Sequence, residues 1–282
     1  MIAIDIKSEI SEKINLPSLP VVYVRLSEAI QSPNTSVSDI CKIINTDAGL
    51  ATRLLKIANS TMYSFTSKVE TVKKAVLVVG TRELHDLALA LYVLKMFKNI
   101  SPNLIDIKEF WKHNIACGLA ARAIASLRKE VNVERFFVAG LLHDLGRIFL
   151  YIAFPEESYE TLNIAKRENR ILFKVEEQFF GYDHAQIGGF LLDNWAIPQN
   201  LVEMIAWHHA PRKAPKKYFL DAATIHLADI LAHALCYGYS GEQFVPPLDE
   251  KTWQQIGIEP SEIINVMKKV DEQFPIVASS VL

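Results

Sequence analysis

Apolar residues recur at helical spacing along nearly the whole chain, in segments of roughly ten to twenty residues that end at Pro, Gly, Asn or Ser. Strict alternation of apolar and polar residues does not persist long enough to indicate a β-sheet. Ser36 and Asp39 have the spacing of a capping box, and Asp47 is placed to cap the next helix. The pattern therefore predicts an all-α fold.

Two breaks in this pattern divide the chain into three parts. The break at Ser101-Pro-Asn103 separates an N-terminal helical lobe, residues 1–100, from a second helical block, residues 101–240. Val245-Pro-Pro-Leu248 cannot be regular helix, and we assign residues 241–282 to a structural C-terminal tail. Nearly every residue capable of unusual chemistry lies in the second block.

Composition and charge narrow the possible function classes. The chain has 30 Lys and Arg against 32 Asp and Glu, and this formal charge of −2 argues against nonspecific binding to duplex nucleic acid. It has 11 Gly and 12 Pro, which is few for a strand-rich fold with many turns. The 3 cysteines form no CxxC pair, so we expect neither a disulfide framework nor a thiolate zinc site.

Export and membrane insertion are not expected. Asp5 and Glu9 stand where a secretory signal would need a cationic start and an apolar run. The most apolar long window, residues 136–155, carries His143, Asp144 and Arg147 at its centre, and each is costly in a bilayer. We interpret this window as a core helix around a site, in a protein of the reducing cytoplasm.

Ionisable side chains share helix faces with apolar residues in the second block. His184 lies on an apolar stripe, and Asp229 occupies a second one. An unpaired carboxylate in a core is costly, so Asp229 needs a cation or several hydrogen-bond donors. By contrast, we expect His226 and His233 to be surface or packing residues, because we place them off the face that holds Asp229.

Paired polar residues indicate a metal centre. His113 lies on an apolar face, the pair His143-Asp144 ends a buried segment, and His208-His209 precedes a proline break. Neighbouring imidazole and carboxylate side chains are long enough to converge on one ion, or to hold two. Nitrogen and carboxylate donors without thiolate suit Fe, Mn, Zn or Ni. Because such a site activates water near neutral pH, the sequence predicts phosphoester hydrolysis.

At these residues the chain resembles a known group. His113, His143-Asp144 and Asp229 match, in order and rough spacing, the H…HD…D signature of the HD superfamily of metal-dependent phosphohydrolases. Further stretches are similar to the HDOD branch, a family of bacterial signalling proteins: Leu16-Pro-Ser-Leu-Pro20, Asp47-Ala-Gly-Leu50 through Arg53-Leu-Leu55 to Asn59-Ser60, and Gly181-Tyr-Asp-His184. The resemblance covers about residues 14–235 and implies an HD-type helical bundle with an N-terminal helical lobe.

Seven residues are the expected ligands of one or two divalent ions: His113, His143, Asp144, His184, His208, His209 and Asp229. The expected catalytic residues are Asp144 and Arg147, with Arg147 either stabilising phosphate charge or pairing with Glu176 or Glu177. A simpler alternative is that Asp144 only fixes the tautomer of His143 at a helix end. Related cyclic-dinucleotide phosphodiesterases carry a lysine after their His-Asp pair and a Gly-Tyr-Pro stretch after their paired histidines. Because this chain has neither, cyclic di-GMP hydrolysis is not expected.

Two functions remain open on these grounds. In the first, the metal site activates water for in-line attack on a nucleotide or another phosphorylated small molecule. In the second, the bundle binds metal or a nucleotide without turnover, and the N-terminal lobe acts on a kinase, response regulator or cyclase in trans. Arg212, Lys213, Lys216 and Lys217 form either a solvated loop or a patch that attracts a phosphorylated ligand. The substrate, the metal and the oligomeric state are not specified by the sequence.

Overall fold

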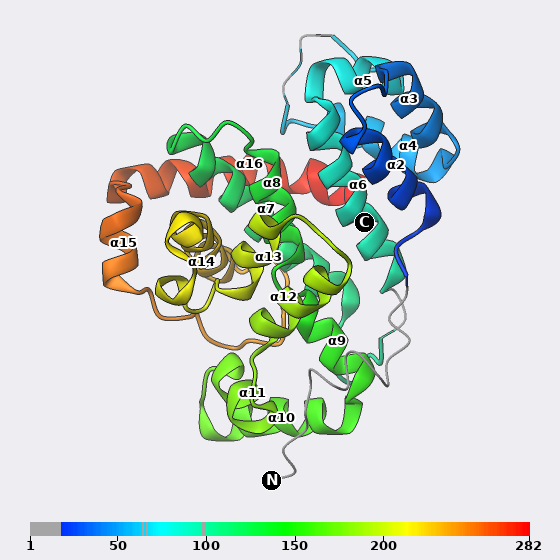
Figure 1. Cartoon of the computed structure of the whole chain (residues 1–282). Coiled ribbons are helices and arrows are strands. Elements are labelled where there is room, and N and C mark those ends of the chain that lie inside the picture. Colours follow the sequence, from blue (N-terminus) through cyan, green and yellow to red (C-terminus); the bar gives the residue numbers. More distant parts are fainter. Residues whose placement is uncertain (1–17, 64, 66, 98–99) are drawn as a thin grey trace. The chain divides into compact units, whose positions relative to one another are not determined.

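The computed structural model describes residues 18–282 except for residues 64, 66 and 98–99. Within these ranges every regular element is a helix and no strand occurs, which confirms the predicted all-α fold (Figure 1). The expectations placed on Asp5, Glu9 and the start of the Leu16-Pro-Ser-Leu-Pro20 stretch lie outside the described residues.

The chain divides into two compact units. Within the described residues, one comprises residues 100–268, and the other comprises residues 18–97 and 269–282. The last helix, α16 (Pro260–Val281), contributes residues to both units. The three-part division expected from the sequence stays a prediction.

The smaller unit is built from short amphipathic helices that meet at a buried aliphatic core. Its helices, besides part of α16, are α2 (Val21–Gln31), α3 (Val37–Asn45), α4 (Ala48–Ala58), α5 (Val72–Val79) and α6 (Thr81–Met96). The predicted capping box is confirmed at α3, because Ser36 accepts from the Asp39 N–H while Asp39 accepts from the Ser36 N–H. Asp47 caps α4 by accepting from the Leu50 N–H, as predicted.

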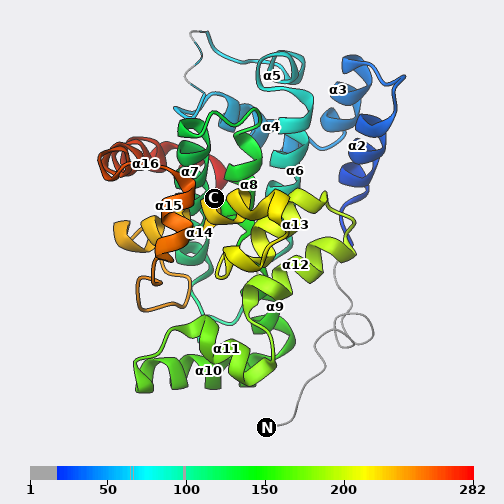
Figure 2. The same ribbon diagram turned by 60° about the vertical axis from the view of Figure 1, so that its left-hand side comes forward.

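The larger unit holds all of the expected site residues. Its helices, besides part of α16, are α7 (Ile107–Leu127), α8 (Glu134–Leu142), α9 (Leu145–Ala153), α10 (Pro155–Glu168), α11 (Leu172–Phe180), α12 (His184–Asn194), α13 (Gln199–Ala206), η1 (Pro211–Lys213), η2 (Lys216–Tyr218), α14 (Phe219–Leu235) and α15 (Glu250–Ile256). The long helix α7 packs against α8 and α14, and α12 packs against α9 and α13 (Figure 2). Helices α10 and α11 form a pair at one end of this unit.

Glycines allow two of these helix pairs to touch backbone to backbone. A Cβ added at Gly140 of α8 would lie 2.7 Å from the Gly118 backbone of α7. A Cβ added at Gly146 of α9 would lie 2.0 Å from the carbonyl oxygen of His184, the first residue of α12. Since a larger residue would separate the helices, these glycines let the middle of α7 and the start of α12 approach the α8–α9 segment closely.

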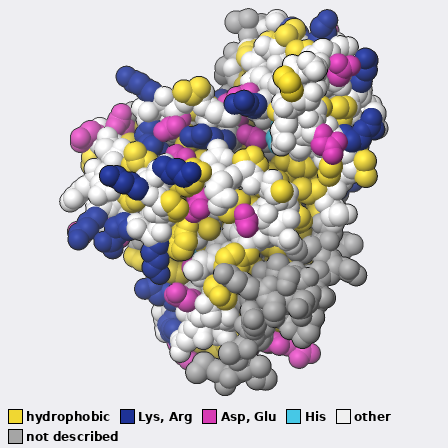
Figure 3. Space-filling model, viewed as in Figure 1, with side chains coloured by type: hydrophobic (Ala, Val, Ile, Leu, Met, Phe, Trp, Pro, Cys, Tyr) yellow, Lys and Arg dark blue, Asp and Glu magenta, His cyan; other side chains and the backbone are white. Residues whose placement is uncertain are grey.

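Among the described residues, the stretch Glu134–Ala153 is long and apolar enough by length and composition to cross a membrane, but 89% of its 18-residue apolar window is buried inside the protein. It is divided into α8 and α9 by a turn at His143-Asp144. The structure thus places this stretch in the core, with its polar centre at the site, as the sequence indicates. On the face shown in Figure 3, acidic and basic side chains are interspersed and histidine is barely visible.

Candidate metal centre

The seven expected ligands come from five places in the larger unit. His113 lies on α7, His143 and Asp144 form the α8–α9 turn, His184 begins α12, His208 and His209 follow α13, and Asp229 lies on α14. All are buried except His209, which is half-buried. The structure therefore brings the expected ligands together, whereas their role as ligands stays a prediction.

Three histidine imidazoles lie close to one carboxylate oxygen of Asp229. Its Oδ1 atom lies 3.2 Å from Nε2 of His113, 3.4 Å from Nε2 of His143 and 3.3 Å from Nε2 of His233. Burial by itself would raise the pKa of Asp229, but the neighbouring His233 and the imidazole hydrogen bonds hold it well below its ordinary value. Asp229 is therefore a carboxylate at neutral pH.

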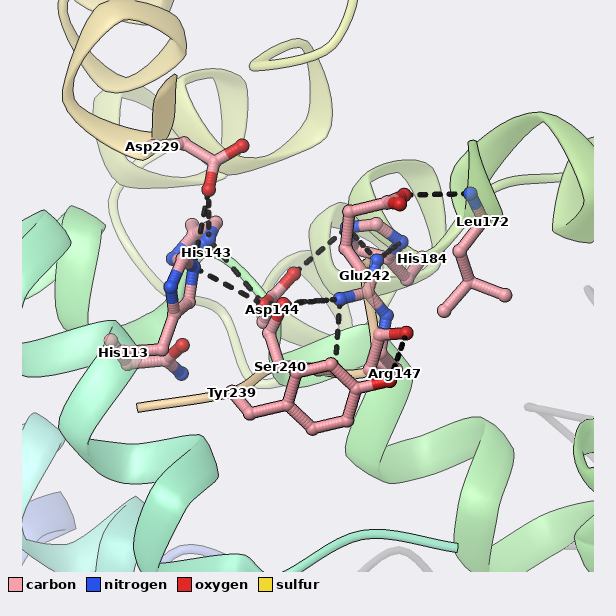
Figure 4. A network of polar contacts seen from close by, with 12 residues as sticks. His113, His143, Asp144, Arg147, Leu172, His184, Asp229, Tyr239, Ser240 and Glu242 are labelled. Atoms are coloured by element: carbon pink, nitrogen blue, oxygen red, sulfur yellow. Dashed lines mark hydrogen bonds and ion pairs between the residues drawn. The ribbon is translucent and has the colours of Figure 1, made fainter. Parts of the chain in front are cut away.

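Asp144 lies between two groups of side chains (Figure 4). Its Oδ1 atom is 2.9 Å from Nε2 of His184, and its Oδ2 atom is 3.5 Å from Nε2 of His143. Arg147 approaches Oδ2 at 3.3 Å. Burial would raise the pKa of Asp144, but the charge of Arg147 and the nearby imidazoles lower it well below its ordinary value.

His143 and His208 have the hydrogen-bonding pattern of metal ligands. The Nδ1–H of His143 donates to the Gly140 carbonyl at 2.7 Å, and that of His208 donates to the Ile205 carbonyl at 2.8 Å. In both rings the buried Nε2 atom has no hydrogen-bond partner among the described residues. A backbone carbonyl on Nδ1 leaves the lone pair on Nε2, which is how ligating histidines are usually held.

Two imidazoles of the cluster, His113 and His208, are held neutral. Burial and then the neighbouring His143 lower the pKa of His208 well below its ordinary value, and burial and His233 lower the pKa of His113 to about 4. Both imidazoles are therefore neutral at neutral pH, as a ligand must be. Burial would lower the pKa of His143 as well, but the charge of Asp144 outweighs it and raises the pKa well above its ordinary value. Four overlapping groups have donor atoms within 4.8 Å of one another: His184-His208-His209, His113-His143-Asp144, His113-Asp229-His233 and His143-His208-Asp229. The donor set fits a divalent ion.

His184 is held by hydrogen bonds on both ring nitrogens. Its Nδ1–H donates to Glu176, and its Nε2 lies 2.9 Å from Asp144 and also 2.9 Å from Nε2 of His209. Burial and Arg147 would lower the pKa of His184, but Glu176 and Asp144 outweigh them and raise it to about 9. His184 differs from His143 and His208 in having a carboxylate, not a backbone carbonyl, as the partner of its Nδ1–H.

Arg147 is buried, and its guanidinium contacts four residues of the larger unit. Its Nε–H donates to Glu176 at 3.1 Å, and its Nη1 atom donates to Asp144 at 3.3 Å and to the Ser240 carbonyl at 3.0 Å. Its Nη2 atom lies 2.8 Å from Nδ1 of His184. Of the two alternatives for Arg147, the structure shows the pairing with Glu176, and a contact with phosphate stays a prediction.

His233 lies on the face of α14 that holds Asp229, contrary to the expectation from the sequence, with its Nε2 atom 3.3 Å from Oδ1 of Asp229. His233 follows Asp229 by one helical turn on α14, and residues four apart share a helix face. The i, i+4 spacing was therefore the signal that could have identified it. His226 is buried and packs as expected, since its Nδ1–H donates to the His208 carbonyl at 2.8 Å and its Nε2 accepts from the Asp249 N–H.

A pocket of about 420 Å³ opens beside this cluster, within the same unit. His209 lines it together with Phe173, whose ring stacks on the His209 imidazole at 4.0 Å between centroids. Trp207 contributes a further apolar surface. The exposed Lys174 and Lys213 supply positive charge, and Glu177, Asp183 and Asp249 supply acidic groups. Of the basic loop at 212–217, Lys213 thus reaches the pocket, whereas Arg212 pairs with Asp249 at 3.0 Å.

Solved structures share this fold over nearly the whole chain. An HDOD domain protein with unknown function from Geobacter sulfurreducens aligns with a TM-score of 0.77 and 22% identity, over 98% of this chain and 95% of that one. A structure named "Putative phosphohydrolase" from Shewanella amazonensis SB2B aligns with a TM-score of 0.76 and 22% identity, over 98% and 97% of the two chains. At this identity the likeness shows the fold alone.

Sequence comparison identifies the family. A protein of Treponema pallidum (strain Nichols), named only as uncharacterized, is 27% identical over 225 residues, which are 79% of this chain and 43% of that protein. This chain thus spans less than half the length of that relative. Residues 16–211 match the HDOD domain, and this is well over half of the sequence. The chain therefore belongs to the HDOD domain family.

Proposed function

We propose that this chain is a metal-dependent phosphohydrolase of the bacterial cytoplasm that acts on a nucleotide or another small phosphoester. One observation carries the proposal: two buried imidazoles, His143 and His208, present partnerless Nε2 atoms beside the buried carboxylates Asp144 and Asp229. Such an arrangement leaves lone pairs and negative charge unpaired unless a cation is bound. The name of the Shewanella structure agrees with this chemistry.

The residues around Asp144 would hold an ion, which could be Fe, Mn, Zn or Ni, and fix the geometry of the site. His113, His143, Asp144, His208 and Asp229 are the nearest donors for it. A bound divalent ion polarises a phosphoester oxygen and makes water nucleophilic near neutral pH. Arg147 acts as a positioning residue here, because it fixes the Oδ2 atom of Asp144 from within the core.

His184 and His209 would carry protons between the cluster and the pocket. His184 is protonated at neutral pH, whereas burial and then its imidazole neighbours lower the pKa of His209 well below its ordinary value. Their Nε2 atoms lie 2.9 Å apart, and His209 lines the pocket. A proton on His184 can therefore reach a leaving group through His209. Lys174 and Lys213 would attract the phosphate.

Metal analysis and a hydrolysis assay together test this function. The protein, purified without a chelating column, is analysed for metals and assayed with bis(p-nitrophenyl) phosphate and with nucleotides in the presence of Mn²⁺, Fe²⁺, Zn²⁺ or Ni²⁺. We expect bound metal and turnover that falls by about a hundredfold or more in Asp144→Asn. The control Asp193→Asn alters an exposed acid of α12 and should retain full activity. A folded, metal-loaded wild type that hydrolyses none of these substrates would contradict the proposal.

A regulatory module is the second candidate, and the environment of Arg147 favours it. The cation that could have met a phosphate at the cluster is instead buried among Glu176, Asp144 and Ser240. In this case the site binds metal or a nucleotide without turnover, and the lobe within Pro17–Phe97 acts on a signalling protein in trans. Unchanged control of that partner by Asp144→Asn would favour the module over the enzyme.

A further inference from the structure

His233 occupies a position that the H…HD…D signature does not include. It lies one turn beyond Asp229 on α14, and its Nε2 atom is 3.3 Å from Oδ1 of Asp229. Its ring centroid is 4.3 Å from that of His113, with an angle of 43° between the ring planes. The side chain is 12% exposed, whereas those of His113 and Asp229 are 1% and 4% exposed.

The environment of Asp229 Oδ1 is too crowded for hydrogen bonding alone. Three imidazole Nε2 atoms, from His113, His143 and His233, lie 3.2 to 3.4 Å from this single oxygen. A carboxylate oxygen offers two lone pairs, so it cannot accept three well-directed hydrogen bonds. Within the part of the chain that the structure describes, the Nε2 atom of His143 accordingly has no hydrogen-bond partner. At least one of these nitrogens therefore lies against the oxygen without a well-directed hydrogen bond to it.

We propose that His233 is a metal ligand, which holds a cation together with His113 and Asp229 on the α14 side of the cluster. The donor atoms of these three residues all lie within 4.8 Å of one another. A cation among them would be coordinated by the imidazole lone pairs and the carboxylate. Two imidazole ligands favour Zn²⁺, Ni²⁺ or Fe²⁺ over Mg²⁺. This inference rests on the metal centre of the proposed function and adds a ligand to it.

A hydrogen bond from His233 that merely orients Asp229 is the competing explanation. The two can be separated with His233→Gln, because a glutamine amide can still donate to a carboxylate but is a poor metal ligand. His233→Ala removes both functions. His85→Gln is the matched control, since His85 lies on α6 of the other unit, where it contacts Ser27 and Asp86.

The experiment titrates Zn²⁺ into the metal-free full-length chain in competition with a chelating dye. We expect His233→Ala and His233→Gln either to lose one equivalent of Zn²⁺ or to bind it at least about tenfold more weakly than the wild type. His85→Gln should match the wild type. In the wild type, Zn²⁺ should also shift the Nε2 resonance of His233 in a ¹⁵N imidazole spectrum, a readout that does not depend on how the variants fold.

Two results would overturn the assignment. Wild-type stoichiometry and affinity in His233→Gln would show that His233 only donates a hydrogen bond, and an unshifted His233 resonance in the zinc-loaded wild type would exclude ligation directly. If Asp144→Asn loses Zn²⁺ while His233→Gln does not, this inference fails and the proposed metal centre survives. If the wild type binds none of Zn²⁺, Ni²⁺, Fe²⁺ and Mn²⁺, both fail together.

Discussion

Individual histidines of this cluster differ in what holds their Nδ1 atom. For His143 and His208 the partner is a backbone carbonyl, which places a proton on Nδ1, and Nε2 has no hydrogen-bond partner among the described residues. For His184 the partner is the buried carboxylate of Glu176, which instead raises the pKa of the imidazole. The same residue type therefore supplies metal donors in one half of the site and a proton donor in the other.

Glu176 stabilises the part of the site around His184 and Arg147. Replacing it with glutamine removes its charge and keeps its shape. It accepts from the Nε–H of Arg147, from the backbone N–H of His184 and from the His184 ring. Burial would raise the pKa of Glu176, but His184 and Arg147 lower it to about 2, so it is ionised. Glu176→Gln leaves two buried cations with one carboxylate fewer, and we expect it to lower the free energy of unfolding by about 3 kcal/mol.

Urea unfolding monitored by circular dichroism measures this difference. Glu177→Gln is the matched control, because Glu177 is the exposed neighbour on the same helix and should change stability by less than about 0.5 kcal/mol. Equal unfolding free energies for the two variants would show that the Arg147–Glu176 pair does not contribute to the stability of the folded protein.

At the scale of the helices, the close contact between α9 and α12 determines how His184 and Asp144 lie relative to each other. The added Cβ of Gly146→Ala would lie 2.0 Å from the His184 carbonyl oxygen and 2.5 Å from the Gly188 nitrogen, and these are backbone atoms that cannot rotate away. We therefore expect α12 to move away from α9, with a loss of about 1–3 kcal/mol in stability and weaker Zn²⁺ binding, because His184 and Asp144 separate.

The same substitution in another helix separates crowding from helix propensity. Gly49→Ala lies in α4, where the added Cβ would meet only the Asp47 side chain, at 3.2 Å. It should change stability by no more than about 1 kcal/mol and leave Zn²⁺ affinity unaltered. Calorimetric titration of both variants decides the matter, and unchanged Zn²⁺ affinity in a folded Gly146→Ala protein would refute the argument.

Across the whole molecule, the predictable features are those that depend on local sequence. Helical periodicity gave the all-α fold, and the capping box at Ser36 follows from residues three apart. The partners of buried polar side chains are harder to predict. Arg147 is 29 positions from Glu176 and 93 from Ser240, and no local sequence pattern pairs them. His233 is an intermediate case. Its i, i+4 spacing from Asp229 indicates a shared helix face, whereas the expectation placed it off that face.

The cluster also links metal binding to the stability of the larger unit. Four buried neighbours, His143, Asp144, His208 and Asp229, come from three separate segments of the chain, so an ion that binds them favours the folded state. A ligand at a thousand times its dissociation constant adds about 4 kcal/mol to the free energy of unfolding. We therefore expect a chelator to lower the melting temperature by several degrees and excess Zn²⁺ or Mn²⁺ to restore it, as measured by differential scanning calorimetry. In Asp229→Asn the melting temperature should no longer respond to metal. A wild-type melting temperature that is the same with chelator and with each metal would mean that these side chains balance one another without an ion.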